Sequence, residues 1–187
     1  AIGGDARAQY EVGAQYLVGD GAVKKDYDAA FYWLLRGSEK NNEALYELAV
    51  CYSNGWGTPQ NYLAAFSCFR QVAEEEEPGE LKADAEYRLG KCYEWGKGVK
   101  SNRSMALYNY MQAAIGGHMK ARVDVANAYW QGWAVQPDTV EALKWFILSG
   151  DAAREIEYIE RGMTSVQVEE ARQRAEAWQR ERAIAGE

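Results

Sequence analysis

Histidine, cysteine and proline are scarce in this 187-residue chain, which holds one, three and three of them. The single histidine, His118, cannot supply the histidine pair of a helical zinc-protease motif, and the three cysteines are not spaced as zinc ligands. No sequence feature brings a serine or cysteine nucleophile to His118. The 28 acidic residues always offer carboxylate pairs, but no pair stands out from a solvated surface. We therefore expect no enzyme, no metal site and no cofactor.

Long apolar runs and clusters of basic residues are also missing. No stretch of about 18 apolar residues occurs, so we expect no segment that inserts into a membrane. The formal net charge is −7, which argues against nucleic-acid binding because such binding rests on clustered Lys and Arg. The acidic surface favours a basic partner or simply serves solubility. The sequence shows no signal-peptide pattern, and a cytoplasmic and a periplasmic location in a bacterium fit it equally.

What the chain does have is a motif that recurs four times. A small residue is followed by an aliphatic residue at +4, a small residue at +5, a tyrosine at +8 and a glycine at +11. The tyrosines are 36, 41 and 36 residues apart, a period typical of repeat architectures. Because offsets +4 and +8 share one helical face, each copy is expected to be the first helix of a unit, and the small residue at +5 to admit a neighbouring backbone. The copies are Ala8-Val12-Gly13-Tyr16-Gly19, Ala44-Leu48-Ala49-Tyr52-Gly55, Ala85-Leu89-Gly90-Tyr93-Gly96 and Ala121-Val125-Ala126-Tyr129-Gly132.

A glycine-rich turn and a second helix follow each copy. The glycine at +11 stands just past the last periodic residue, where it supplies a left-handed helix end. In the third unit the turn over residues 96–101 superficially suggests a phosphate loop, but its spacing differs and no strand precedes it. No segment alternates as a strand, so the predicted fold class is all-α. Second helices are expected over residues 27–36, 62–72, 105–114 and 139–148.

The full motif, Ala-x3-Leu-Gly-x2-Tyr-x2-Gly-x-Gly-Val followed by Ala and Trp in a second helix, resembles the SEL-one-like repeat (SLR) family, relatives of tetratricopeptide repeats. The best matches are residues 85–99 and 121–145, and the resemblance covers about residues 1–150. It implies an α/α right-handed superhelical solenoid of helix-turn-helix repeats. Such proteins serve as adaptors or scaffolds, for example in bacterial signalling, and catalysis is not their usual function. The departures from the pattern are Thr58, Cys68, Asn109 and Ala134.

Some secreted members of that family carry a paired cysteine in each unit, which bridges its two helices. Here only the second unit has two, Cys51 and Cys68, so that disulfide pattern is absent. All three cysteines, including Cys92, fall within helical periodicity. We expect them to be buried free thiols.

The start of the chain repeats a segment that lies between two units. Residues 1–8, Ala-Ile-Gly-Gly-Asp-Ala-Arg-Ala, are similar to residues 114–121, which close the third unit and open the fourth. We therefore expect residues 1–4 to be the tail of a preceding repeat, and the chain to be a monomeric fragment of a longer repeat protein. One solenoid domain is expected over residues 1–187, with repeats at about 5–40, 41–78, 80–117 and 118–150 and capping helices over 151–187.

Two segments depart from the repeat pattern. The first is a Glu-rich insertion at residues 74–79, which we expect to be a solvated helix end, with contact to a basic partner as the alternative. The second is the C-terminal segment, where Thr164 and Gln167 fit a capping box. Its narrow apolar stripe predicts a helix that shields the last unit, the alternative being an amphipathic helix that docks on a membrane or a partner. The stripe consists of Val168, Ala171, Ala175 and Trp178.

If the tetratricopeptide geometry holds, the first helices line a concave face. Residues at −1, +2, +6, +9 and +10 from the first small residue then point into the groove. Aromatic rings beside amide side chains suit an extended peptide, because rings supply buried area and amides hold backbone groups. The tyrosines at +2 suit the groove and the core equally, whereas the tryptophans favour the groove. The candidate binding residues are Tyr10, Tyr46, Asn54, Tyr87, Trp95, Asn127, Trp130 and Gln131.

These features predict a non-enzymatic adaptor that binds a peptide or a partner protein on the concave face. The alternative is a structural spacer of a larger multi-repeat protein that packs through its convex face or its ends. Exposed aromatic residues distinguish the two: they gather in the groove in the first case, and on the second helices or an end in the other.

Overall fold

The computed structural model describes residues 5–19, 21–75 and 77–185. These residues form ten α-helices and no strand, so the predicted all-α fold is confirmed. The expected tail of a preceding repeat, residues 1–4, lies outside the described residues. The helices are α1 (Ala6–Val18), α2 (Tyr27–Gly37), α3 (Asn42–Asn54), α4 (Tyr62–Glu75), α5 (Glu80–Trp95), α6 (Arg103–Ile115), α7 (Met119–Gln131), α8 (Thr139–Ser149), α9 (Ala153–Glu160) and α10 (Ser165–Ala185).

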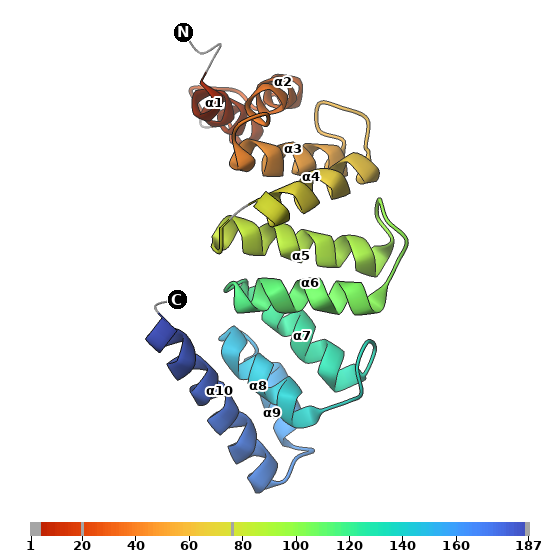
Figure 1. Cartoon of the computed structure of the whole chain (residues 1–187), viewed down its shortest axis with the longest axis vertical. Helices are drawn as coiled ribbons and strands as arrows, with labels where there is room; N and C mark the ends of the chain where they lie inside the picture. Colours follow the sequence, from red (N-terminus) through yellow and green to blue (C-terminus); the bar gives the residue numbers. More distant parts are fainter. Residues whose placement is uncertain (1–4, 20, 76, 186–187) are drawn as a thin grey trace.

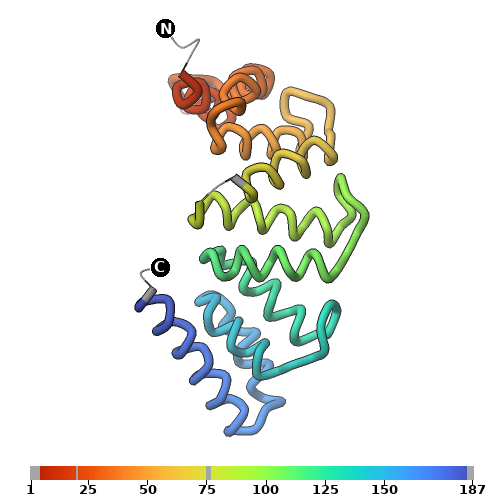
Figure 2. Tube along the Cα trace, viewed as in Figure 1, coloured from red at the N-terminus to blue at the C-terminus, as the bar shows by residue number. Residues whose placement is uncertain are grey.

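Helix pairs stack in chain order along the long axis of the molecule (Figure 1). The first helices of the repeats are α1, α3, α5 and α7, and each packs against its second helix, α2, α4, α6 or α8. Each pair also packs against the next pair, as expected for a solenoid, in which a repeat contacts its neighbours. The Cα trace shows α10 running back beside α8 at the C-terminal end of the stack (Figure 2).

Local signals set the helix boundaries. Four helices begin after an Asp or Asn whose side chain accepts a hydrogen bond from a backbone N–H of the first turn. These residues are Asp26 before α2, Asn41 before α3, Asn102 before α6 and Asp138 before α8. The predicted left-handed glycine ends are confirmed after α3, α5 and α7. The prediction is wrong for Gly19 after α1, because its ψ of 127° lies outside the left-handed helical region. All four second helices are present, each extending slightly past its predicted range.

The small residue at +5 permits close helix packing, mainly against a side chain of the second helix. The expected backbone approach occurs at Gly13, where an added Cβ atom would lie 3.3 Å from the Leu34 backbone nitrogen. A Cβ atom on Gly90 would lie 2.4 Å from the Tyr110 ring of α6, and one on Gly13 would lie 2.7 Å from Leu34 Cγ of α2. The large buried residue of the second helix therefore occupies the space left by the glycine of the first helix.

The second glycine of the Gly-x-Gly turn connects successive repeats in the second and third units. Gly57 and Gly98 adopt positive φ angles of 66° and 75°, which L-residues with a side chain rarely tolerate. A Cβ atom there would lie 2.1 Å from the Tyr27 carbonyl oxygen and 2.0 Å from the Tyr62 carbonyl oxygen, at the start of the preceding second helix. The fourth repeat has Ala134 at this position, and no residue other than glycine in the described segments has a positive φ. The last repeat is therefore joined to its predecessor in a different way.

The C-terminal helix packs as its sequence predicts. Ala171 and Ala175 are buried, and Val168 and Trp178 pack against the core cluster that contains α6, α7 and α8. The capping box is confirmed: the Thr164 backbone N–H donates to Gln167 Oε1 (2.9 Å) and the Gln167 N–H donates to Thr164 Oγ1 (3.3 Å).

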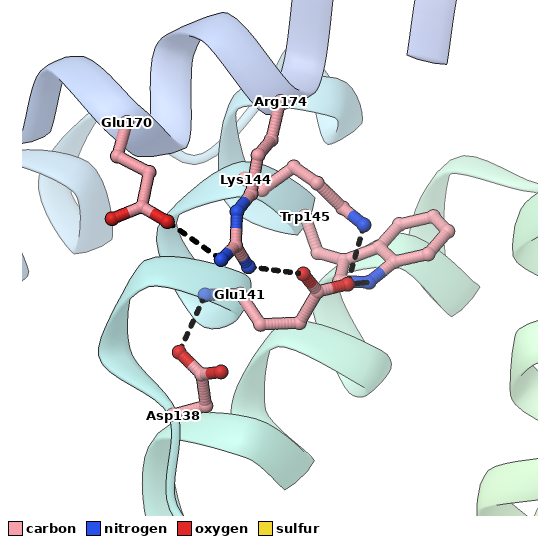
Figure 3. Close-up of polar contacts among 6 residues, drawn as sticks. All are labelled: Asp138, Glu141, Lys144, Trp145, Glu170 and Arg174. Atoms are coloured by element: carbon pink, nitrogen blue, oxygen red, sulfur yellow. Dashed lines mark hydrogen bonds and ion pairs between the residues drawn. The ribbon is translucent and has the colours of Figure 1, made fainter. Parts of the chain in front are cut away.

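A polar cluster around Glu141 connects α10 to α8 (Figure 3). The Trp145 indole N–H donates to Glu141 Oε1 (2.9 Å), and Lys144 pairs with the same oxygen. Arg174 of α10 reaches Glu141 Oε2 (3.4 Å) while it also pairs with Glu170 (2.6 Å). Since the Glu141 side chain is only 17% exposed, this carboxylate is a partly desolvated anchor for the C-terminal helix.

The three cysteines are free thiols, as expected, but only two of them are buried. Burial raises the pKa of Cys51 to about 12 and that of Cys92 to about 11, so both stay protonated at neutral pH. Cys68 is half-buried. Along the described part of the chain, no helix combines the length and apolarity that crossing a bilayer requires.

Candidate protein-binding face

The last turns of the first helices expose the residues at offset +10. Asn54 at the end of α3, Trp95 at the end of α5 and Gln131 at the end of α7 are all exposed. Trp95 is the largest of them, and 66% of its surface is accessible. Three of the candidate binding residues therefore lie on the face formed by the first helices, which we call the first-helix face.

A groove of about 250 Å³ lies between α3 and α5 on this face. Ser53 and Asn54 contribute one wall, and the opposite wall comes from α5 and includes Trp95. The side chains of α4 between the walls are largely buried. We call this feature the α3–α5 groove, and its lining residues are Ser53, Asn54, Tyr62, Ala65, Phe69, Arg88, Lys91, Cys92, Trp95 and Lys97.

The tyrosines at +2 are half-buried and contact neighbouring elements. Tyr46 packs edge-on against Phe69 with 5.4 Å between ring centroids, and the Arg88 Nε–H donates to its hydroxyl (3.2 Å). Tyr87 stacks on His118 at a centroid distance of 4.0 Å. Tyr10 packs against the core cluster of Leu34. Among the alternatives left open by the sequence, these contacts favour the core for most of each ring.

In the fourth repeat the candidate residues are less accessible. Trp130 is half-buried, with its ring 6.3 Å from Phe146 of α8 and 5.5 Å from Tyr158 of α9. Asn127 is half-buried as well, and only Gln131 is exposed. The structure thus brings Asn54 and Trp95 together in one groove and places Trp130 against α9.

The offset +3 carries charged residues that the tetratricopeptide offsets miss. Arg88 of α5 and Asp124 of α7 occupy this position. Asp124 pairs with Lys91 (3.0 Å), which also contacts Glu94 (3.4 Å), and the Tyr110 hydroxyl donates to Glu94 (2.6 Å). A signal in the sequence was available, because all four units are charged at +3: Glu11, Glu47, Arg88 and Asp124.

Burial sets the protonation behaviour of two residues at this face. It raises the pKa of Glu47, and the Asp84 carboxylate adds to the effect whereas Arg88 opposes it. Burial lowers the pKa of His118, although Asp84 at 3.5 Å opposes the shift. The neutral form of His118 suits its position, because its Nδ1 atom accepts a hydrogen bond from the Ala121 N–H (3.1 Å) and so caps α7.

His118, the one histidine, acts as a helix cap stacked on Tyr87. Within the described residues no group of three or more His, Cys, Asp and Glu side chains has a geometry that could hold a metal ion.

Comparison with known proteins gives one family. The family model described as the Sel1 repeat matches residues 6–42, 42–76, 83–118 and 120–153. A curated relative, chitin synthase regulatory factor 2 of Schizosaccharomyces pombe, is 33% identical over 109 residues, which are 57% of this chain. The chain spans about a fifth of that relative's length, since the match covers 20% of it.

Two solved structures share the fold. A protective antigen of uropathogenic Escherichia coli that displays an SLR fold has a TM-score of 0.81 at 24% identity, covering 92% of this chain and 37% of the antigen. A Sel1 repeat protein from Oxalobacter formigenes has a TM-score of 0.71 at 29% identity, covering 81% of this chain and 61% of that protein. Both show that the stacked helix pairs form the solenoid of this repeat class.

Proposed function

Because the chain belongs to the Sel1 repeat family, whose members generally mediate protein–protein interactions, we propose that it is a non-enzymatic adaptor that binds a peptide or partner protein on its first-helix face. The repeat fold is typically a non-catalytic interaction scaffold. Within this general role, the proposal assigns the binding to the α3–α5 groove and the residues that border it.

The observation that supports this assignment is the exposure of Trp95 beside the groove. Tryptophan buries a large area on binding and is enriched among residues that dominate interface energetics. Here 66% of the Trp95 surface is accessible in the free chain, and the amide of Asn54 lines the same groove. An aromatic ring and a free amide oxygen on opposite walls match the side chains and the backbone of an extended peptide.

A second candidate rests on the opposite face. A groove of about 430 Å³ lies between α4 and α6 and includes Phe66, Met105 and Tyr108. Leu63 of α4 is 65% exposed and Tyr108 of α6 is 57% exposed. These residues favour a structural spacer that packs through its second helices.

Affinity capture from the native cell distinguishes the two candidates. The full-length protein is compared with the variant Asn54→Ala/Trp95→Ala and with the matched variant Leu63→Ala/Tyr108→Ala, each removing two exposed side chains. The adaptor proposal predicts loss of the partner only in the first variant, with thermal unfolding unchanged. Loss only in the second variant would instead establish the second-helix face as the interface.

A further inference from the structure

We infer that the α3–α5 groove takes an acidic segment of its partner, with a carboxylate side chain between Arg88 and Lys97. This inference rests on the proposed function and names the chemical class of the ligand.

The charge of the groove is opposite to that of the chain. The formal net charge is −7, yet the lining contains Arg88, Lys91 and Lys97 and no Asp or Glu. A basic partner, which the overall charge favours, would meet three cations here. The groove is therefore complementary to an acidic ligand.

Two of the three cations are available to a ligand. Lys91 is already paired with Asp124 and Glu94, which lie outside the lining. For Arg88 and Lys97, no carboxylate in the described segments lies within ion-pair distance.

Neutral contacts hold these two cations in place, while the carboxylates of Glu47 and Asp84 act on the Arg88 charge from beyond ion-pair distance. The Arg88 Nε–H donates to the Tyr46 hydroxyl (3.2 Å), which leaves the outer guanidinium nitrogens for a bidentate carboxylate. The Lys97 ammonium lies 5.0 Å from the centroid of the Tyr62 ring. Both are thus preorganised, which lowers the entropy cost of binding an anion.

The surroundings of the two cations strengthen an ion pair with the ligand and orient the peptide. Ala65, Phe69 and Cys92 are buried at the groove, and apolar surroundings strengthen an ion pair relative to one in open water. Asn54 donates to the Val50 carbonyl (2.8 Å), so its Oδ1 is directed away from this bond and can accept a peptide N–H. Trp95 offers an apolar surface to the side chain that neighbours the carboxylate.

The test starts from a random-peptide phage library selected against the immobilised full chain at low salt. Selected peptides are synthesised with a fluorescent label, and their Kd is measured by anisotropy. The groove variant is Arg88→Gln/Lys97→Gln. The matched control is Lys100→Gln/Arg103→Gln, which removes the same charge from exposed positions outside the groove.

The expected result is enrichment of peptides containing Asp or Glu. Their affinity should fall at least about tenfold in the groove variant, and equally when the acidic residues of the peptide are changed to amides. Added salt should weaken the binding. The control variant should bind as tightly as the parent chain. Circular dichroism verifies that each variant unfolds at the same temperature as the parent chain, and Tyr46→Phe shows whether an effect of Arg88 arises only from its hydrogen bond.

The contradicting results distinguish the acidic ligand from the proposed function, which is binding on the first-helix face. The selection could enrich neutral or basic peptides that require Asn54 and Trp95 but still bind the groove variant. That result would contradict the acidic ligand and leave the first-helix face as the binding site. Peptides whose binding ignores Asn54 and Trp95, or a selection that enriches no peptide, count against both.

Discussion

The middle repeats and the last repeat share the same motif, but their aromatic residues have different surroundings. In the middle, α3 and α5 border an open groove, and Trp95 is 66% exposed. In the last repeat, Trp130 near the end of α7 packs against α8 and α9. The middle repeats are also joined by the close turns at Gly57 and Gly98, whereas the last has Ala134 there and is held by α9 and α10.

This difference shows that neighbouring offsets of one motif meet different environments. Trp95 stands at +10 and Trp130 at +9, so a shift of one residue turns the ring from the surface to the next helix. The end of a solenoid must shield apolar surface that an inner repeat shares with its neighbour. We therefore expect stability to depend on the last repeat's aromatic residues, and binding to depend on those of the middle repeats.

The largest effect is expected at the turn between the middle repeats. Gly98→Ala places a Cβ 2.0 Å from a backbone oxygen at a positive φ, and should lower the free energy of unfolding by more than about 3 kcal/mol. Gly21→Ala is the matched control, because its φ is also positive but nothing lies within 4 Å of the added atom. It should cost about 1 kcal/mol. Urea unfolding measures both, and equal losses would contradict the close turn as a joint.

The next largest effect on stability is expected from Trp130, and its contrast with Trp95 tests the comparison of the two regions directly. Trp130→Ala should lower the free energy of unfolding by about 2–3 kcal/mol, less than a fully buried tryptophan because the ring is half-buried. Trp95→Ala should change it by less than about 0.5 kcal/mol, as expected for an exposed side chain. If chemical denaturation ranked them in the opposite order, the assignment of the two regions would be wrong.

The attachment of α10 predicts a smaller effect. Glu141→Ala removes the acceptor of the Trp145 indole and the partner of Arg174, and should cost about 1–2 kcal/mol. Glu170→Ala removes only an exposed pair with Arg174, and should cost less than about 0.5 kcal/mol. Hydrogen exchange of α10 amides should accelerate in the first variant and not in the second.

The smallest effect is the pH dependence from His118. Burial lowers its pKa in the folded chain, so the unfolded chain binds the proton more readily and stability falls as the pH drops below the ordinary histidine range. The loss should approach the worth of a helix N-cap, about 1 kcal/mol. His118→Asn keeps a capping side chain that does not titrate, and its stability should not show this loss between neutral and mildly acidic pH. If the variant lost as much stability on acidification as the parent chain does, His118 would be excluded as the source.

Local features of the sequence predicted most of the fold. The period, the glycine helix ends and the Thr164–Gln167 capping box depend on residues close in sequence. All are confirmed except the left-handed end at Gly19. The contacts of the predicted binding residues depend on other repeats. Tyr46 meets Phe69 and Trp130 meets Tyr158, and neither partner is visible in the motif of a single unit.

The groove itself was only partly predictable for a similar reason. The offsets taken from tetratricopeptide geometry include Asn54 and Trp95 but omit +3, where Arg88 lies. The third repeat also begins differently, because α5 has 16 residues whereas α3 and α7 have 13. Residues 74 and 75 are the last of α4, residues 77–79 lie between α4 and α5, and position 76 is outside the described residues.

Site-specific photo-crosslinking tests the central claim most directly. A photoreactive amino acid is placed at position 95, at position 130 or at position 63, and the bound partner is irradiated in the native complex. The account predicts a crosslink to the partner from position 95 and none from positions 130 and 63. A crosslink from position 63 without one from position 95 would contradict it and place the partner on the second helices.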